Sequence, residues 1–213
     1  MSQRVTRLAP LSGVVFAVLT FVGFFAGGET PDTNATPAKV LAYYAAHRST
    51  IETTSILVAI AFLFAIFWSA SLHSYLRRTG GAQSLAALVL AGGVLMFMGA
   101  STLAAIEYGL AHEIHIVGPQ TAQSLNILSN VLFIPLIAGG CVFGLGSGLA
   151  ILRGAALPNW LGWVAIVLGV VAVIGPIGFF ALLVLLVWTI VASILVYLRS
   201  DGDVAPLAPA PAV

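Results

Sequence analysis

Residues 107–148 read EYGLAHEIHIVGPQTAQSLNILSNVLFIPLIAGGCVFGLGSG, and this stretch decides how the chain packs. It begins at Glu107 and Tyr108, where one apolar segment ends, crosses a polar region, and enters a second long apolar segment. In that second segment, amide side chains come first and glycines follow at positions 140, 144 and 148. Most of the polar groups that the sequence can place inside a helical bundle lie here or close by.

The composition surrounding this stretch indicates a protein that is dissolved in lipid. The chain has 213 residues, of which 60% are hydrophobic and only 7% are charged, whereas soluble domains carry about 25% charged residues. Such a chain cannot cover itself with polar surface, so its helices are expected to face a lipid bilayer, which is its first predicted partner. The net charge of +1 predicts no nucleic-acid partner. The single cysteine, Cys141, excludes an internal disulfide.

Six apolar segments predict an all-α, six-transmembrane-helix bundle formed by one domain, residues 1–200. We expect a kink at Pro135 in the fourth span and a tight hairpin at Gly175–Gly178 between the last two. The first segment is long enough to span, so we interpret it as an uncleaved span rather than a signal peptide. The tail, residues 201–213, is rich in proline and alanine and is expected to be disordered and cytoplasmic. The predicted spans are 11–28, 52–76, 84–111, 119–153, 158–174 and 178–199.

Two loop motifs predict helix starts between the first and second spans. Thr36 followed by Pro37 is typical of an N-cap and a first helical position. The short helix that follows places Val40 and Tyr44 on one side, and we expect it to lie on the membrane surface in the first outer loop. Residues 49–52, Ser-Thr-Ile-Glu, match a capping box at the start of the second span.

The distribution of basic residues predicts the orientation. With the N-terminus inside, the inner segments hold six arginines, and the outer segments hold only Lys39 and Arg48. This excess of positive charge inside predicts that both termini are cytoplasmic, in a plasma (inner) membrane.

The spacing of small residues predicts which helix faces are buried, because membrane helices associate through residues that let backbones approach. In the fourth span the glycine face, extended backward at helical spacing, reaches the three amides of residues 123, 126 and 130. In the third span Glu107 shares a face with Ala104, Ala100 and Gly93. We therefore predict a polar pocket in the outer half of the bundle, above a middle closed by apolar and small side chains. Its candidate residues are Glu52, Ser55, Glu107, Tyr108, Gln123, Asn126 and Asn130.

Each of these groups also has a structural interpretation. Glu52 suits a helix-capping carboxylate, and the three amides suit interhelical hydrogen bonds. Glu107 either reaches headgroup water or carries a function, because ionisable groups inside a membrane are costly to keep.

A metal site is a further hypothesis. His112 and His115 are three residues apart, and Glu107, Glu52 or His47 could complete a tetrahedral set. The spacing is not that of the HExxH motif, so neither a metal nor any other cofactor is expected, and no catalytic residue is assigned.

Two segments carry a resemblance to other proteins. VLAYYAAHRSTIE (40–52) leads into the second span, and LPNWLGWVAIVLG (157–169) opens the fifth. With these segments the chain resembles multi-pass integral membrane proteins of the kind common in actinobacteria. The resemblance implies a membrane location and no particular activity.

Three functional hypotheses remain from the sequence. The first is a non-enzymatic membrane protein that binds a small or lipidic ligand, or a membrane-protein partner, in its outer pocket. The second is a small-solute transporter, which the kink and the glycine-rich fourth span favour. The third is a metal-dependent enzyme at the outer face that uses His112 and His115.

Overall fold

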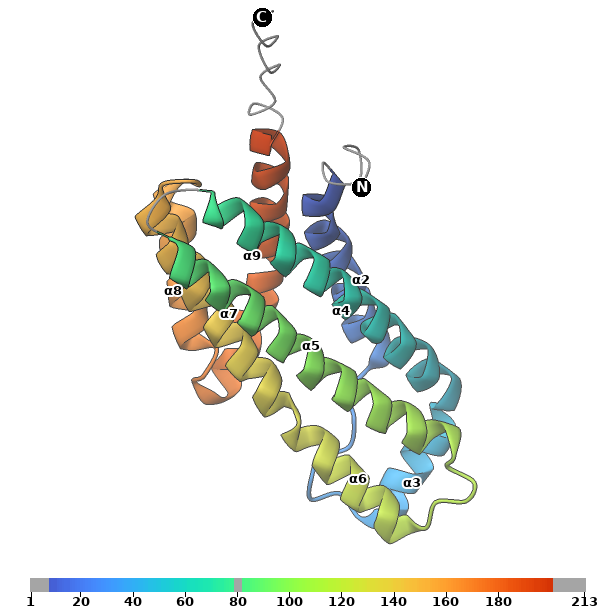
Figure 1. Ribbon diagram of the computed structural model, residues 1–213. Helices are drawn as coiled ribbons and strands as arrows, with labels where there is room; N and C mark the ends of the chain where they lie inside the picture. Colours follow the sequence, from blue (N-terminus) through green and yellow to red (C-terminus); the bar gives the residue numbers. More distant parts are fainter. Residues whose placement is uncertain (1–7, 79–81, 201–213) are drawn as a thin grey trace, which may run out of the picture.

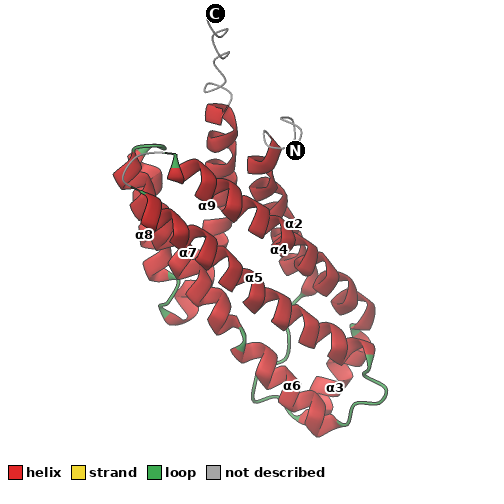
Figure 2. Cartoon of the chain, in the orientation of Figure 1, coloured by secondary structure: helices red, strands yellow, loops and turns green. Residues whose placement is uncertain are grey.

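The computed structural model describes residues 8–78 and 82–200, and that part of the chain is helical with short connections (Figures 1 and 2). The all-α fold class is therefore confirmed there. The elements are η1 (Ala9–Leu11), α2 (Ser12–Gly27), α3 (Pro37–Ala46), α4 (Arg48–Arg77), α5 (Gln83–His112), α6 (Pro119–Val131), α7 (Phe133–Gly154), α8 (Asn159–Val171) and α9 (Gly175–Ser200).

Five of the described helical segments, not six, are long and apolar enough to cross a membrane. The exception is α8, which has 13 residues and is therefore only about 20 Å long, against the roughly 30 Å of a bilayer's hydrocarbon core. The expected fifth span, 158–174, corresponds to this shorter helix, so the predicted count of six spans is not confirmed. The five segments are Ala9–Gly27, Arg48–Arg77, Gln83–His112, Pro119–Gly154 and Ile177–Arg199.

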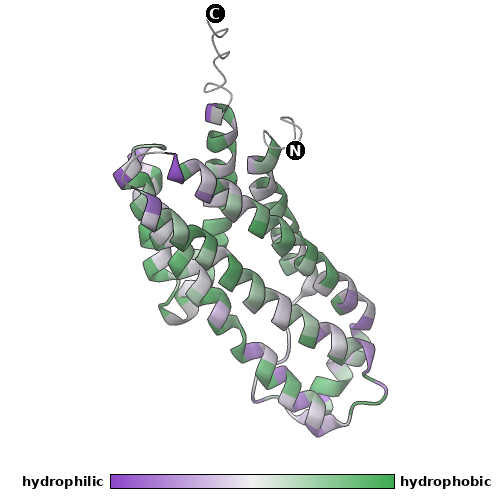
Figure 3. Cartoon of the chain, viewed as in Figure 1, coloured by the Kyte–Doolittle hydropathy of each residue, from purple (hydrophilic) through white to green (hydrophobic). Residues whose placement is uncertain are grey.

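The two ends of the bundle differ in character. At one end, which we call the terminal end, α2 begins beside the last turns of α9, and Ser193 Oγ donates a hydrogen bond to the Pro10 carbonyl. At the other end, α4 and α5 extend past α2 and meet α3 and α6 (Figure 1). We call α3, α6 and the segment 28–36 the cap. Hydrophilic residues lie in the cap and at the helix ends next to it, and others lie at the terminal end, while the middle of the bundle is mostly hydrophobic (Figure 3).

The short helix α3 forms where Thr36 and Pro37 predict it. Thr36 Oγ1 accepts a hydrogen bond from the Lys39 amide at 3.4 Å, so the predicted N-cap is confirmed. The side that carries Val40 and Tyr44 is fully buried against α5, α6 and the start of α4. That side packs on protein, so a location on the membrane surface would have to involve the remaining faces of α3.

The predicted capping box at residues 49–52 is wrong. Helix α4 begins at Arg48, with His47 at the N-cap position and no capping hydrogen bond from a side chain. Glu52 therefore lies inside the helix, where its carboxylate pairs with Arg48 Nε at 2.9 Å.

The predicted kink at Pro135 occurs three residues earlier, at Leu132, where α6 ends and α7 begins. Pro135 lies in the first turn of α7, where its missing N–H group has no intrahelical partner to lose. The hairpin before α9 is displaced in the same way. The turn occupies residues 172–174, and Gly175 already belongs to α9.

Helix α7 packs closely on two neighbours through glycines on two of its sides. A Cβ atom added to Gly139 would lie 2.5 Å from the Met96 amide nitrogen of α5. One added to Gly148 would lie 2.5 Å from the Gly162 carbonyl oxygen of α8. The backbones approach so closely that only glycine fits, as expected for helix packing in a membrane.

Candidate functional site

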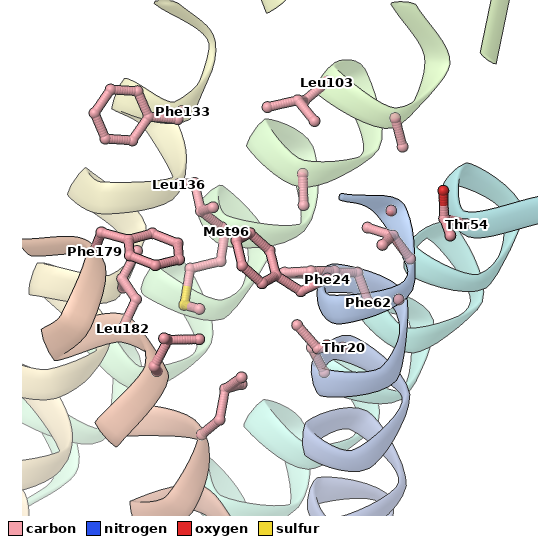
Figure 4. Close-up of a pocket in the computed structure, with 18 of the residues that line it drawn as sticks. Thr20, Phe24, Thr54, Phe62, Met96, Leu103, Phe133, Leu136, Phe179 and Leu182 are labelled. Carbon is pink, nitrogen blue, oxygen red and sulfur yellow. The ribbon is translucent and has the colours of Figure 1, made fainter. Parts of the chain in front are cut away.

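A cavity of about 720 Å³ lies among α2, α4, α5, α7 and α9 (Figure 4). Apolar side chains form most of its wall. Small residues on α5 keep the space open, because Gly93, Ala100 and Ala104 all face it. The apolar lining includes Phe16, Phe24, Phe62, Met96, Leu103, Phe133, Leu136, Phe143, Phe179, Leu182, Leu185 and Leu186.

Polar groups gather at the cap end of this cavity. Glu107 lies one turn beyond Ala104 on α5, and Ser55 lies near the start of α4. The segment 28–36 contributes Glu29 and Asp32, and α6 contributes Asn130. The cavity therefore changes from carboxylates, hydroxyls and an amide at the cap end to mostly aromatic and aliphatic side chains farther in, where only the uncharged hydroxyls of Thr20, Ser69 and Thr189 interrupt the apolar lining.

The cavity extends deep into the bundle and then closes. On α4 its lining runs from Ile51 to Ser69, a rise of about 27 Å at 1.5 Å per residue. That exceeds the roughly 15 Å of hydrocarbon in one leaflet. The predicted closed middle is therefore wrong, because small residues leave space where an apolar plug was expected. Fully buried side chains fill the interior beyond Ser69, among them Leu72, Leu76, Val89, Ile151 and Val196.

Hydrogen bonds to backbone carbonyls hold the helices together at the terminal end. Tyr75 Oη donates to the Ala156 carbonyl at 3.1 Å, and an Arg199 guanidinium nitrogen donates to the same oxygen. His73 Nδ1 lies 2.8 Å from the Ala86 carbonyl oxygen, and since a carbonyl only accepts, Nδ1 carries the proton. The cavity is therefore closed at the terminal end.

The side-chain amides of α6 form hydrogen bonds that hold the segment 28–36 in place at the cap end of the cavity. Asn126 Nδ2 donates to the Pro31 carbonyl at 3.0 Å, and Gln123 Nε2 donates to the Ala35 carbonyl at 2.9 Å. Asn130 Nδ2 donates to the Asn126 carbonyl at 2.8 Å. Of these three predicted residues, only Asn130 lines the cavity. Asn126 and Gln123 act on the segment 28–36, which contributes to the wall itself.

Tyr44 completes this arrangement from α3. Its hydroxyl donates to Asn126 Oδ1 at 3.3 Å, and both side chains are fully buried. Burial, and then the nearby Glu107 carboxylate, raise the pKa of Tyr44 well above its usual range. The phenol therefore keeps its proton and acts as a donor at any physiological pH.

The amide face and the glycine face have different partners, contrary to the prediction that they form one continuous face. Asn126 and Gln123 bond to the segment 28–36, whereas Gly144 and Gly148 pack on α8. The break at Leu132 separates the two helices, so helical spacing cannot be extended from one to the other.

Glu52 and Tyr108 lie outside the cavity lining. The Glu52 carboxylate accepts from His112 Nδ1 at 3.0 Å, which joins the ends of α4 and α5. The Tyr108 ring stacks on His112, with ring centroids 5.4 Å apart. This exposed cluster ties two helix ends together.

The histidines do not converge on a metal site. His112 ends α5, and His115 is exposed in the turn that follows. Within residues 8–78 and 82–200, no group of three or more histidine, cysteine, aspartate or glutamate side chains could hold a metal ion.

The structure also reveals a wall that the sequence interpretation missed, formed by α2 and α9. Phe24 and Phe179 pack with ring centroids 5.0 Å apart and close the gap between these two helices (Figure 4). Glu29 and Asp32 were missed as well, because they were assigned to a loop and not to a helix face. No spacing pattern links Phe24 to Phe179, because the two residues lie 155 positions apart in the sequence.

Five apolar helical segments of spanning length around a partly open cavity indicate a multi-pass membrane protein. Comparison with known protein families, with curated proteins and with solved structures finds no match to this chain.

Proposed function

We propose that this protein binds an amphipathic, lipid-like molecule in the cavity, with the apolar part among the phenylalanines and the polar head at the cap end. The single observation that carries this proposal is the sorting of the cavity wall along its length. The apolar wall includes Phe24, Phe62 and Phe179, and the polar end includes Glu107 and Asn130. A volume of about 720 Å³ is within the range of small-molecule sites.

Because the cavity is closed at the terminal end, the structure favours binding over transport. A transporter needs a route to both sides, and in this structure the core beyond Ser69 is packed. We further propose that the cap lies outside the cytoplasm, as the distribution of arginines indicates. The cavity would then admit its ligand from the outer leaflet or the outer surface.

A pair of adjacent substitutions on α5 tests the site. Ala104 lines the cavity and is buried, whereas Ala105 is exposed on the same helix. Ala104→Phe fills the space that the ligand would occupy, and Ala105→Phe adds the same side chain on the bundle's outer surface. Binding of dodecanol, dodecylamine and dodecanoate to the purified protein is measured by their effect on the unfolding temperature.

The proposal predicts that at least one of the three compounds raises the unfolding temperature of the wild type and of Ala105→Phe, but not that of Ala104→Phe. Native mass spectrometry of the unliganded variants checks that both remain folded. Equal ligand responses from the two variants would show that the amphiphile binds elsewhere, and the proposal would fail.

A further inference from the structure

The charge at the cap end of the cavity is of one sign. Three carboxylates line it, Glu29, Asp32 and Glu107. The described lining contains no lysine, arginine or histidine. Two cations lie near this end but outside the lining: the Arg48 guanidinium is paired with Glu52, and Lys39 is exposed on α3.

Glu107 is the least exposed of these carboxylates, since Glu29 and Asp32 are exposed. It is half-buried on α5 and forms no salt bridge or hydrogen bond with any described residue. Two tyrosines of α3 lie close enough to respond to its charge, and burial together with that charge raises the pKa of Tyr43. Neither phenol supplies a positive charge. A carboxylate inside a helical bundle is costly to keep without a counter-charge, so Glu107 is suited to a partner that arrives with the ligand.

A second group in this wall also lacks a partner. The Ser55 side chain is only 4% exposed, and its Oγ has no hydrogen-bond partner among the described residues. Buried hydroxyls are ordinarily hydrogen-bonded, so an unpartnered one calls for an explanation. Ser55 and Glu107 both line the cap end of the cavity, and an N–H donor on a ligand head can use a serine oxygen as well as a carboxylate.

We propose that the ligand's polar head carries a protonated amine, which lies among Glu107, Asp32 and Glu29 while the chain extends toward Phe62. This inference rests on the proposed function and adds the charge of the head to it. An ammonium group neutralises the carboxylates and donates up to three hydrogen bonds. A head group whose only charge is a carboxylate or phosphate would meet only like charge at this end of the cavity.

Three amphiphiles with the same chain test the charge preference. Dodecylamine, dodecanol and dodecanoate differ only in the head group, and at pH 8 their heads are cationic, neutral and anionic. Each is titrated into the full-length protein in phosphatidylcholine nanodiscs, and the dissociation constants are compared. We expect the amine to bind most tightly and the carboxylate most weakly.

Two glutamine variants locate the preference. Glu107→Gln is expected to weaken dodecylamine binding roughly tenfold, the effect of losing one charge-assisted hydrogen bond, and to leave dodecanol binding unchanged. Glu113→Gln removes the same charge from an exposed position outside the cavity and should change neither. An unchanged amine affinity in Glu107→Gln would overturn the role of this residue.

The outcomes separate the two proposals. If none of the three amphiphiles binds, the proposed function fails. If all three bind with similar constants, or the carboxylate binds most tightly, the amphiphile site stands and the amine preference is wrong.

The amine can belong to a free alkylamine or to a lipid headgroup. Repeating the dodecylamine titration in phosphatidylethanolamine nanodiscs distinguishes the two sources. A lipid ammonium that occupies the site would compete and weaken the apparent affinity for dodecylamine.

Discussion

The Tyr44 hydroxyl and the Asn126 side-chain oxygen lie 3.3 Å apart, and this hydrogen bond joins α3 to α6 across 82 positions of sequence. Asn126 also donates to the Pro31 carbonyl. One buried side chain therefore connects a helix, a second helix and the segment that forms part of the cavity wall. The stability of the cap should depend on it.

Tyr44→Phe is predicted to destabilise the cap by about 1–3 kcal/mol, because it leaves Asn126 Oδ1 buried without a donor. Hydrogen exchange of α3 and of the segment 28–36, followed by mass spectrometry, measures the effect. Tyr43→Phe serves as the control, since Tyr43 is only half-buried and its hydroxyl forms no hydrogen bond with a described residue. Equal exchange rates in the two variants would contradict the prediction.

The pH dependence of the same region follows from the raised pKa of Tyr44. The folded protein holds the phenolic proton more tightly than the unfolded chain, whose tyrosines titrate near pH 10. The stabilisation is therefore fully present below pH 10 and decreases as the pH rises above it. Unfolding followed between pH 9 and 11.5 should show this loss in the wild type.

The loss should be smaller in Tyr44→Phe, which has no phenolic proton at this position. Tyr43 also has a raised pKa and should account for part of the remaining slope. Identical alkaline slopes in the wild type and the variant would show that Tyr44 does not titrate with unfolding.

The contact between α7 and α8 can be tested with alanine. Gly148→Ala places a Cβ 2.5 Å from the Gly162 carbonyl oxygen, so the backbones must separate at a cost of about 1–3 kcal/mol. Gly109→Ala adds the same methyl group to α5, where nothing lies within 4 Å, and should be neutral or slightly stabilising. Urea unfolding in detergent compares the two variants. A Gly148→Ala protein as stable as the wild type would show that α7 and α8 are not so closely packed.

The proposed orientation has its own experiment. Gln120 is exposed at the start of α6 in the cap, and Gln83 is exposed at the start of α5 at the terminal end. In a Cys141→Ser background, cysteine at position 120 should react with a membrane-impermeant maleimide in intact cells. Cysteine at position 83 should react only after the cells are opened. The reverse pattern would place the cap in the cytoplasm.

The sequence predicted the fold class well because composition acts on the whole chain. With 60% hydrophobic residues gathered in long continuous segments, helices satisfy the backbone hydrogen bonds within each segment in lipid. Helical spacing placed four residues on one side of a helix: Glu107, Ala104, Ala100 and Gly93. All four line the cavity. Helical periodicity was sufficient there because α5 continues without a break.

Periodicity was insufficient wherever a partner lies far away in the sequence. The spacing of Gln123 and Asn126 indicates a shared face but not what covers it, and their carbonyl partners, Ala35 and Pro31, are 88 and 95 residues away. The expectation for proline failed for a different reason. Pro135 was expected to interrupt a helix, but a proline fits the first turn of a helix equally well, and sequence spacing does not distinguish the two.

The hydrogen bonds that hold the segment 28–36 have a consequence for how substitutions could change the cavity. Asn126 and Gln123 hold the segment 28–36 by the carbonyl groups of Pro31 and Ala35, and every residue type supplies a carbonyl. The chain path is therefore independent of the neighbouring side chains at positions 29, 30 and 32, which line the cavity. Substitution at those three positions can change the head group that is accepted while the segment 28–36 stays in place.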